Sequence, residues 1–379
     1  MEKSASAWVF FTTVPDSQRS SVAASVTAVG VPPGSIVYGV YDPPPAIAPV
    51  SDLESTIRQL YKEKNWAFDE GLAPFIPKRW VVYEPMVLFN AGTFDVAAWQ
   101  HELDVIDRDL LFQRLLHTHF PRLTHIAINK PIDPHTVMRI PMNILGVHGD
   151  FGPSPTARSL ESPTTADFTS AFWCTTTQNG IRQTWAPMYT MFSRGNIKEK
   201  KRLLDSYTAL NHTWVVDLYA GIGYFSLCYA RNGGRLMCWE LNPWSVEALV
   251  RNCRLNNFSC KRDSMEYDPN TQVFVFNDTN EKCIETVTRL WNTPLPISHI
   301  NLGLLPSSRQ SWPIANRLLE LSTLPTVVHV HENVHKNQLE STLESVADEF
   351  PFTRPLDTFL VKTFAPDVWH TVYDLQKEL

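Results

Sequence analysis

Residues 213–256 limit the possible folds of this chain more than any other stretch. An apolar run ends at Asp217, a turn containing Gly221 and Gly223 follows, and then come a helical segment and a second apolar run that ends at Glu240. This order of strand, turn, helix and strand is the first half of a nucleotide-binding βαβ unit. It predicts an α/β nucleotide-binding domain in the C-terminal half of the chain.

The residues of this unit also indicate which ligand it would bind. Gly221 and Gly223 would let the backbone approach a ligand where a Cβ atom would collide. Glu240 follows Asp217 at close to the offset of about 20 residues at which an acid reaches the two hydroxyls of a ribose. Ser226 stands where a dinucleotide site has its third glycine, which argues against a pyrophosphate. We expect the Asp217 carboxylate at the pocket mouth, which favours a cation such as the sulfonium of S-adenosylmethionine; a packed turn without a ligand is the alternative.

The rest of this half alternates between strand and helix patterns. We expect strands at about 213–218, 235–240, 272–277, 297–304 and 325–331, and helices at about 223–232, 243–256, 279–290, 311–321 and 337–348. Two further strands, 358–364 and 368–374, are so close in sequence that they must form a hairpin. The pattern predicts a seven-stranded Rossmann-type sheet with one antiparallel strand, the fold of class I S-adenosylmethionine-dependent methyltransferases. An oxidoreductase, the more distant alternative, would usually continue with a sixth parallel strand.

The length of 379 residues is sufficient for two or three domains. We expect an α+β region at 1–115 with strands near 8–12, 35–41 and 79–89, and a small, mostly β domain at 116–190 with strands near 123–129 and 136–145. Residues 152–170, rich in Pro, Ser, Thr and Ala, are predicted to be a mobile surface loop. Residues 191–379 are predicted to form the catalytic domain that binds S-adenosylmethionine.

Cysteine usage and hydropathy bear on the compartment. The six cysteines include no C-x-x-C pair, which is more typical of buried free thiols in a reducing compartment than of disulfides or a zinc site. The sequence has no signal-peptide pattern at its start and no apolar run long enough to span a membrane. We therefore expect a cytoplasmic protein without membrane association. The net charge of −6 does not indicate a nucleic-acid-binding protein, but it allows a local basic patch.

Ligands of open α/β sheets bind outside the carboxyl ends of the strands, so the residues that follow each strand are the candidates for the site. Asp278 and Thr279 follow the third strand and could hydrogen-bond an adenine edge or cap the next helix. Asn301 ends the fourth strand, and together with Pro306 it is a candidate for positioning the substrate. No pair of nucleophile and base is apparent, so the catalytic residues stay unassigned.

Two further groups of residues have alternative interpretations. His329 and His331 would share one face of a strand, but they lack a Cys or carboxylate ligand beside them, because Glu332 points the other way. We expect a packed or hydrogen-bonded strand end there and no metal site. The basic run of residues 198–202, which includes Lys200, is either a solvated helix face or a phosphate contact.

Several stretches together resemble one family. They are M-F-S-R-G-N-I-K-E-K (191–200), V-D-L-Y-A-G-I-G-Y-F-S (216–226), E-L-N-P-W-S-V-E-A-L (240–249), H-I-N-L-G-L-L-P-S-S (299–308), W-P-I-A (312–315), V-H-V-H-E-N-V (328–334) and V-K-T-F-A-P-D-V-W-H (361–370). The C-terminal half resembles the wybutosine-synthesising aminocarboxypropyltransferases of tRNA, which are relatives of the tRNA guanine N1-methyltransferases. The combination of F-S-R-G-N with N-L-G-L-L-P-S-S is specific to the first group.

The resemblance implies a transfer reaction with S-adenosylmethionine as co-substrate. The 3-amino-3-carboxypropyl group would move to C7 of 4-demethylwyosine at position 37, next to the anticodon of tRNA(Phe), and methylthioadenosine would leave. Ser193 and Lys200 match family positions that contact the cofactor, and Glu240 matches the ribose acid. Asp278 and Thr279 stand where the family has an Asp-Asn pair, so Thr279 is a departure.

The resemblance also leaves alternatives open. Residues 1–115 are expected to take part in tRNA recognition, and the protein is expected to be a monomer. A tRNA guanine N1-methyltransferase with the same pocket is the second hypothesis. A tRNA-binding protein without catalytic activity is the third.

Overall fold

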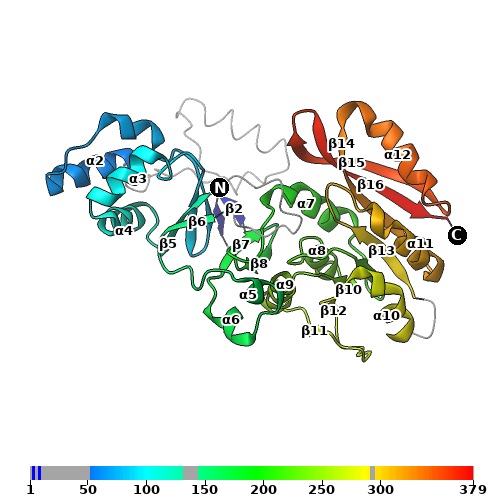
Figure 1. Ribbon diagram of the computed structural model, residues 1–379. Coiled ribbons are helices and arrows are strands. Elements are labelled where there is room, and N and C mark those ends of the chain that lie inside the picture. The colour runs from blue at the N-terminus through cyan, green and yellow to red at the C-terminus, as the bar shows by residue number, and fades with distance from the viewer. Residues whose placement is uncertain (1, 5–6, 10–51, 131–143, 291–294, 379) are drawn as a thin grey trace. The chain divides into compact units, whose positions relative to one another are not determined.

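A computed structural model describes residues 2–4, 7–9, 52–130, 144–290 and 295–378 of the chain (Figure 1). Met1–Asp52 and Leu53–Leu379 are two compact units. In the first unit, β1 (Glu2–Ser4) pairs with β2 (Ala7–Val9) in antiparallel orientation. The strands predicted at 35–41 and over most of 136–145 lie outside the described residues.

The second unit begins with a four-stranded sheet and helices that pack on it. The strands, in spatial order, are β3 (Trp80–Tyr83), β4 (Met86–Phe89), β5 (His125–Asn129) and β6 (Ile144–His148). The helices are α2 (Leu53–Lys64), η3 (Glu70–Phe75), α3 (Ala97–Val105) and α4 (Arg108–His119). Their core is rich in aromatic rings, among them Phe94, Trp99 and Phe112, which are almost fully buried.

The stretch predicted to be a loop at 152–170 instead contains two short helices, α5 (Ala157–Glu161) and α6 (Thr165–Ser170). Each begins with a capping box, in which Thr156 or Thr164 exchanges hydrogen bonds with the residue three positions later. Some of the Ser and Thr residues that suggested a loop are therefore the caps at which these two helices begin. The hairpin of β7 (Cys174–Gln178) and β8 (Ile181–Trp185) follows.

The C-terminal sheet contains every strand that the sequence predicts, and one more. The strands are β9 (Trp214–Asp217), β10 (Arg235–Trp239), β11 (Cys260–Arg262), β12 (Val273–Phe276), β13 (Ile297–Leu302), β14 (Val327–His335), β15 (Thr353–Ala365) and β16 (Val368–Lys377). Their spatial order is β11-β12-β10-β9-β13-β14-β16-β15, and β16 is antiparallel to both of its neighbours. The sequence predicted seven strands in this sheet, and the structure has eight. The additional strand, β11, is a three-residue edge strand with two basic residues, and no apolar pattern in the sequence indicated it.

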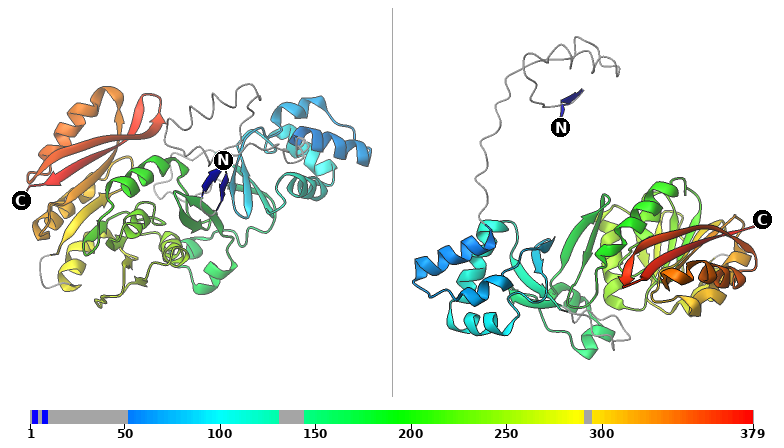
Figure 2. Two further views of the ribbon diagram at one scale, coloured as in Figure 1. Left: turned by 180° about the vertical axis from the view of Figure 1, so that it is seen from behind. Right: turned by 90° about the horizontal axis from the view of Figure 1, so that it is seen from above.

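Helices cover both faces of this sheet (Figures 1 and 2). They are η4 (Arg194–Asn196), α7 (Ile197–Ser206), α8 (Ser226–Arg231), α9 (Pro243–Leu255), η5 (Asn280–Lys282), α10 (Cys283–Leu290), η6 (Arg309–Ser311), α11 (Trp312–Leu321), η7 (Lys336–Gln338) and α12 (Leu339–Asp348). Trp214 and Val216 of β9 pack with α10, α11 and α12, while Val215 packs with α7, α8 and α9. This alternation is why the strand is apolar at every position before Asp217.

A buried ionic network ties α7 to the terminal hairpin. Arg202 Nη1 donates to Asp374 Oδ2 at 2.5 Å, and its other nitrogens donate to Glu199. His329 Nδ1 contacts the second oxygen of Asp374 at 2.6 Å, and Tyr207 Oη donates to Asp374 at 2.9 Å. Asp374 and Glu199 are almost completely buried. The negative charge of each carboxylate is therefore stabilised by these partners and would be costly to bury without them.

All six cysteines are free, and five of them are buried. In the described part of the chain, no helix combines the length and the apolar character that a membrane span requires.

Candidate active site at the glycine turn

The turn after β9 requires glycine for two physical reasons. Gly221 has φ +55° and Gly223 has φ +90°, conformations that L side chains rarely adopt. A Cβ atom at Gly221 would lie 2.8 Å from the Tyr224 ring, and one at Gly223 would lie 2.6 Å from Leu249 Cδ1. The turn is therefore packed against its own domain, in addition to any approach that it allows to a ligand.

The Glu240 side chain fixes this turn relative to the next helix. Its Oε2 accepts from the Gly221 backbone N–H at 2.9 Å, and its Oε1 accepts from the Asn242 N–H at 2.8 Å. Burial raises the pKa of this carboxyl group, and the hydrogen bonds from Asn242 and Gly221 oppose that rise. Each carboxylate oxygen keeps a second lone pair, so the half-buried group can still accept from two ligand hydroxyls.

The sequence predicted Asp217 at the mouth of a pocket, and this prediction is wrong. Asp217 is completely buried, and its carboxylate accepts from Ser226 Oγ at 2.6 Å, from Asn301 Nδ2 at 3.1 Å and from the Tyr219 N–H at 3.2 Å. Burial raises the pKa of Asp217, and the hydrogen bonds from Ser226 and Asn301 oppose that rise. Ser226, which replaces a fingerprint glycine, thus stabilises the carboxylate that precedes the turn.

The two candidates for substrate positioning lie in different surroundings. Asn301 is completely buried against Asp217, and its Oδ1 has no hydrogen-bond partner among the described residues. Pro306 follows a cis peptide bond, and its carbonyl accepts from the Asn333 N–H at 2.9 Å. This bond holds the segment after β13 to the neighbouring strand β14.

Lys200 is buried, and neither interpretation of the basic run anticipated this. Only 2% of the residue is exposed, because Glu199, Lys200 and Leu203 form the inward stripe of α7. Lys200 Nζ donates to Gln178 Oε1 at 3.0 Å and to Gln183 Oε1 at 2.7 Å. Burial lowers the pKa of Lys200 to about 8.

Ser193 and Lys200 meet at Tyr224, directly after the glycine turn. The Ser193 N–H donates to Tyr224 Oη at 3.3 Å, and Lys200 Nζ lies 5.3 Å from the centre of the Tyr224 ring. Lys362 Nζ donates to Ser193 Oγ at 3.3 Å. Tyr224, Gln178 and Lys362 were not predicted, although an aromatic residue immediately after a G-x-G turn was a visible signal for the first.

Asp278 and Thr279 lie at the end of β12, beside the end of β10 that carries Glu240. Asp278 Oδ2 pairs with Lys282 Nζ at 2.7 Å, which lowers the pKa of Asp278. Thr279 Oγ1 accepts from the Glu281 N–H and caps η5. A helix cap was one of the two roles predicted for this residue; the other was a contact to the adenine edge. Asn277 Nδ2 donates to the carbonyl oxygens of Glu240 and Leu241, both at 3.1 Å, so the two strand ends are joined.

Comparison with known proteins identifies the family. Residues 175–286 match the TRM5/TYW2 methyltransferase domain. The chain is 37% identical to tRNA wybutosine-synthesizing protein 2 of Saccharomyces cerevisiae, covering 82% of this chain and 79% of that protein. It is also 37% identical to the protein of that name in Schizosaccharomyces pombe, covering 79% of this chain and 73% of the relative. This chain belongs to the tRNA wybutosine-synthesizing protein 2 family.

Solved structures agree with the fold of this family. The structure of Pyrococcus horikoshii TYW2 in complex with MeSAdo has a TM-score of 0.58 at 19% identity and covers 85% of this chain and 98% of that one. The complex of aTrm5 with tRNALeu has a TM-score of 0.54 at 15% identity, over 91% of this chain and 84% of that one. The predicted class I methyltransferase-like fold with smaller N-terminal sheets is thereby confirmed.

In this member of the family, the strand histidines are hydrogen-bonded to other side chains, as predicted. His329 Nε2 lies 3.0 Å from His299 Nδ1, and His331 Nδ1 lies 2.9 Å from His370 Nε2. Burial lowers the pKa values of His299 and His331, so these rings are neutral. Over the described ranges, no three His, Cys, Asp or Glu side chains are grouped as metal ligands.

We predict that Glu240→Ala weakens the binding of adenosylmethionine about ten- to a hundredfold, because hydrogen bonds to a charged acceptor are worth about 1.5–3 kcal/mol. Isothermal titration calorimetry measures the affinity. Glu247→Ala is the matched control, because Glu247 lies on α9 and pairs with Arg251 at 2.8 Å. Equal affinities for wild type and Glu240→Ala would remove Glu240 from the ligand site.

Proposed function

We propose that this chain transfers the 3-amino-3-carboxypropyl group of S-adenosylmethionine to C7 of 4-demethylwyosine at position 37 of tRNA(Phe). The family to which it belongs makes it an adenosylmethionine-dependent transferase of wybutosine biosynthesis. The observation that carries the proposal is the 37% identity to two yeast relatives over about four-fifths of this chain. A likeness of that extent includes the N-terminal sheet as well as the nucleotide fold.

The proposed cofactor position follows from the strand ends. The Glu240 carboxylate would accept hydrogen bonds from both ribose hydroxyls, above the turn formed by Gly221 and Gly223. Asp278 and Thr279 would lie toward the adenine, because β12 is the neighbour of β10 on the side away from β9. The P. horikoshii relative was solved with MeSAdo, the product that this reaction would release.

The amino-acid arm would lie toward Ser193 and Lys200. Lys200 Nζ is buried with two glutamine oxygens as its hydrogen-bond partners, and none of the carboxylates in the described part forms an ion pair with it. A buried ammonium group without an anionic partner is costly. The carboxylate of the methionine arm would be the anionic partner of the Lys200 ammonium group.

The proposed reaction needs orientation more than acid–base catalysis. C7 of the base attacks the arm carbon that is bonded to sulfur, a carbon–carbon bond forms, and the carbon–sulfur bond breaks. Its electron pair remains on the sulfur of methylthioadenosine, and the base loses the C7 proton. The sulfonium has three carbon neighbours, and the one that reacts is held about 3–3.5 Å from the nucleophile in line with its leaving bond.

Two other functions use the same fold. In a guanine N1-methyltransferase the methyl carbon, and not the arm carbon, would face the tRNA. A binding protein without activity would keep the tRNA surface and lose turnover. The fate of each sulfonium substituent distinguishes the three functions.

We predict that adenosylmethionine labelled in its carboxyl group transfers label to tRNA(Phe) carrying 4-demethylwyosine, while methyl-labelled adenosylmethionine does not. The methyl label should leave with methylthioadenosine, and mass spectrometry of the digested tRNA should detect the added aminocarboxypropyl group. Methyl label in the tRNA would instead identify a methyltransferase. Bound tRNA that acquires neither label would indicate the silent binding protein.

A second prediction concerns pH. Because burial lowers the pKa of Lys200 to about 8, the ammonium group that binds the arm carboxylate is lost as the pH rises through that value. We expect kcat/KM for adenosylmethionine to fall over that range in the wild type. Lys200→Arg should stay active above it, since a guanidinium remains charged, and Lys200→Gln should be weak at every pH.

The matched control for this profile is Lys198→Gln, because Lys198 lies on the same helix and is exposed. Its profile should match that of the wild type. A Lys200→Gln profile that coincides with the wild-type profile would contradict the role given to Lys200.

A further inference from the structure

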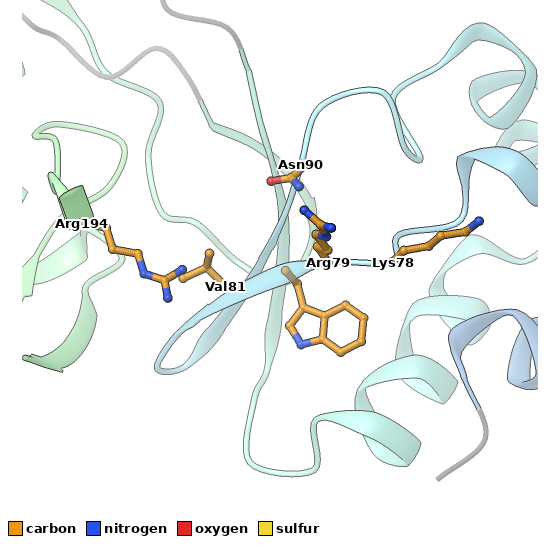
Figure 3. Close-up of a pocket in the computed structure, with 6 residues that line it drawn as sticks. Lys78, Arg79, Val81, Asn90 and Arg194 are labelled. Atoms are coloured by element: carbon orange, nitrogen blue, oxygen red, sulfur yellow. The ribbon is translucent and has the colours of Figure 1, made fainter. Parts of the chain in front are cut away.

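A basic pocket lies away from the glycine turn, on the N-terminal sheet of the second unit. Its volume is about 510 Å³, and its lining residues are Lys78, Arg79, Trp80, Val81, Asn90 and Arg194. Figure 3 shows Arg79 and Asn90 close together and Arg194 entering from the opposite side. Arg194 belongs to η4 and directly follows Ser193, so this pocket begins one residue beyond a candidate cofactor contact.

The register of the β3–β4 hairpin places Arg79 opposite Asn90. Trp80 pairs with Phe89 at the end of this antiparallel ladder; Arg79 directly precedes β3 and Asn90 directly follows β4. Side chains alternate between the two faces of a strand, so Arg79, Val81 and Asn90 share one face. The Trp80 ring packs on the other face, with centroids 6.4 Å from Phe89 and 5.4 Å from Phe120.

The charges around this pocket have one sign. Three of its lining residues are cations and none is acidic, in a chain with a net charge of −6. Within the described ranges, none of the three cations forms an ion pair. By contrast, two half-buried arginines of the same unit are neutralised: Arg58 pairs with Glu54 and Glu70, and Arg114 pairs with Glu63.

A second, smaller cavity is lined both by residues of the basic pocket and by residues next to the candidate cofactor segment. Its volume is about 200 Å³, and it shares Val81 and Asn90 with the basic pocket. Its other lining residues include Thr190, Met191 and Phe192, which directly precede Ser193. The smaller cavity therefore adjoins both the basic pocket and the segment proposed to hold the methionine arm.

We propose that the basic pocket binds a backbone phosphate of the substrate tRNA, beside the nucleotide that is modified. This inference rests on the proposed function, since it takes the RNA strand as the source of the phosphate. Guanidinium groups present paired N–H donors that match phosphate oxygens, and Arg79 and Arg194 line the pocket from two different parts of the chain. Asn90, beside Arg79, adds an amide donor (Figure 3). Phosphate contacts of this kind fix the register of a nucleic acid without reading its sequence.

The test compares single substitutions with equal changes in charge. Arg79→Gln and Arg194→Gln should each weaken tRNA binding about tenfold and should make the plot of log K against log salt shallower by about 0.7–0.9, the contribution of one phosphate. Both side chains are exposed, so the fold should persist. Arg58→Gln and Arg114→Gln remove the same charge outside the pocket and should leave the affinity and the slope at wild-type values.

The arms of this experiment separate the inference from the proposed function. Binding is measured with full-length tRNA(Phe) and no adenosylmethionine, so it does not require turnover. Failure of the wild-type protein to bind tRNA would overturn both. Wild-type binding that Arg79→Gln and Arg194→Gln leave unchanged in affinity and salt slope would overturn the phosphate site alone. Calorimetry with inorganic phosphate is a further measurement. If the wild type binds phosphate saturably, Arg79→Gln loses that binding, and tRNA binding is the same in both, the pocket binds a free anion and the inference is contradicted.

Discussion

The carboxylate of Glu240 joins the glycine turn to the start of the next helix, in the part of the protein where we propose that the cofactor binds. It accepts one backbone N–H from the glycine turn after β9 and another from the start of α9. Both glycines of the turn are fitted against neighbouring side chains, so its path cannot shift without displacing them. The same carboxylate is therefore part of the fold and the proposed acceptor for the ribose, so under this proposal backbone geometry would set the position of the ribose.

Candidate residues from distant parts of the chain lie in succession between this turn and the basic pocket. Tyr224 follows the turn and contacts both Ser193 and Lys200. Arg194 continues from Ser193 into the basic pocket, where Arg79 and Asn90 extend the N-terminal hairpin. A cofactor over the turn and an RNA strand along the hairpin would thus be oriented by adjoining residues, which suits a reaction that is controlled by the alignment of one carbon.

The sequence was sufficient for the sheet because periodicity is a local property. Apolar runs and turn residues located every strand of the C-terminal sheet except β11, whose three residues have no apolar pattern, and they located the α-helices α8 to α12. The positions of Glu240, Asp278 and Thr279 at neighbouring strand ends followed from the rule for parallel sheets.

Side-chain environments could not be predicted in the same way, because they depend on contacts between distant segments. Asp217 is closed off by Asn301, a residue of another strand, and Lys200 is buried by glutamines of the β7–β8 hairpin. The basic pocket depends on the β3–β4 register and on Arg194, which is more than a hundred residues away in sequence. No spacing in the sequence relates these residues.

A crystal structure with adenosylmethionine tests the central claim most directly. The account predicts both ribose hydroxyls within hydrogen-bond distance of Glu240, the arm carboxylate beside Lys200, and the arm carbon next to sulfur facing the open side where the tRNA would lie. A ribose bound away from Glu240, or a methyl group facing that side with the arm carbon turned inward, would contradict it.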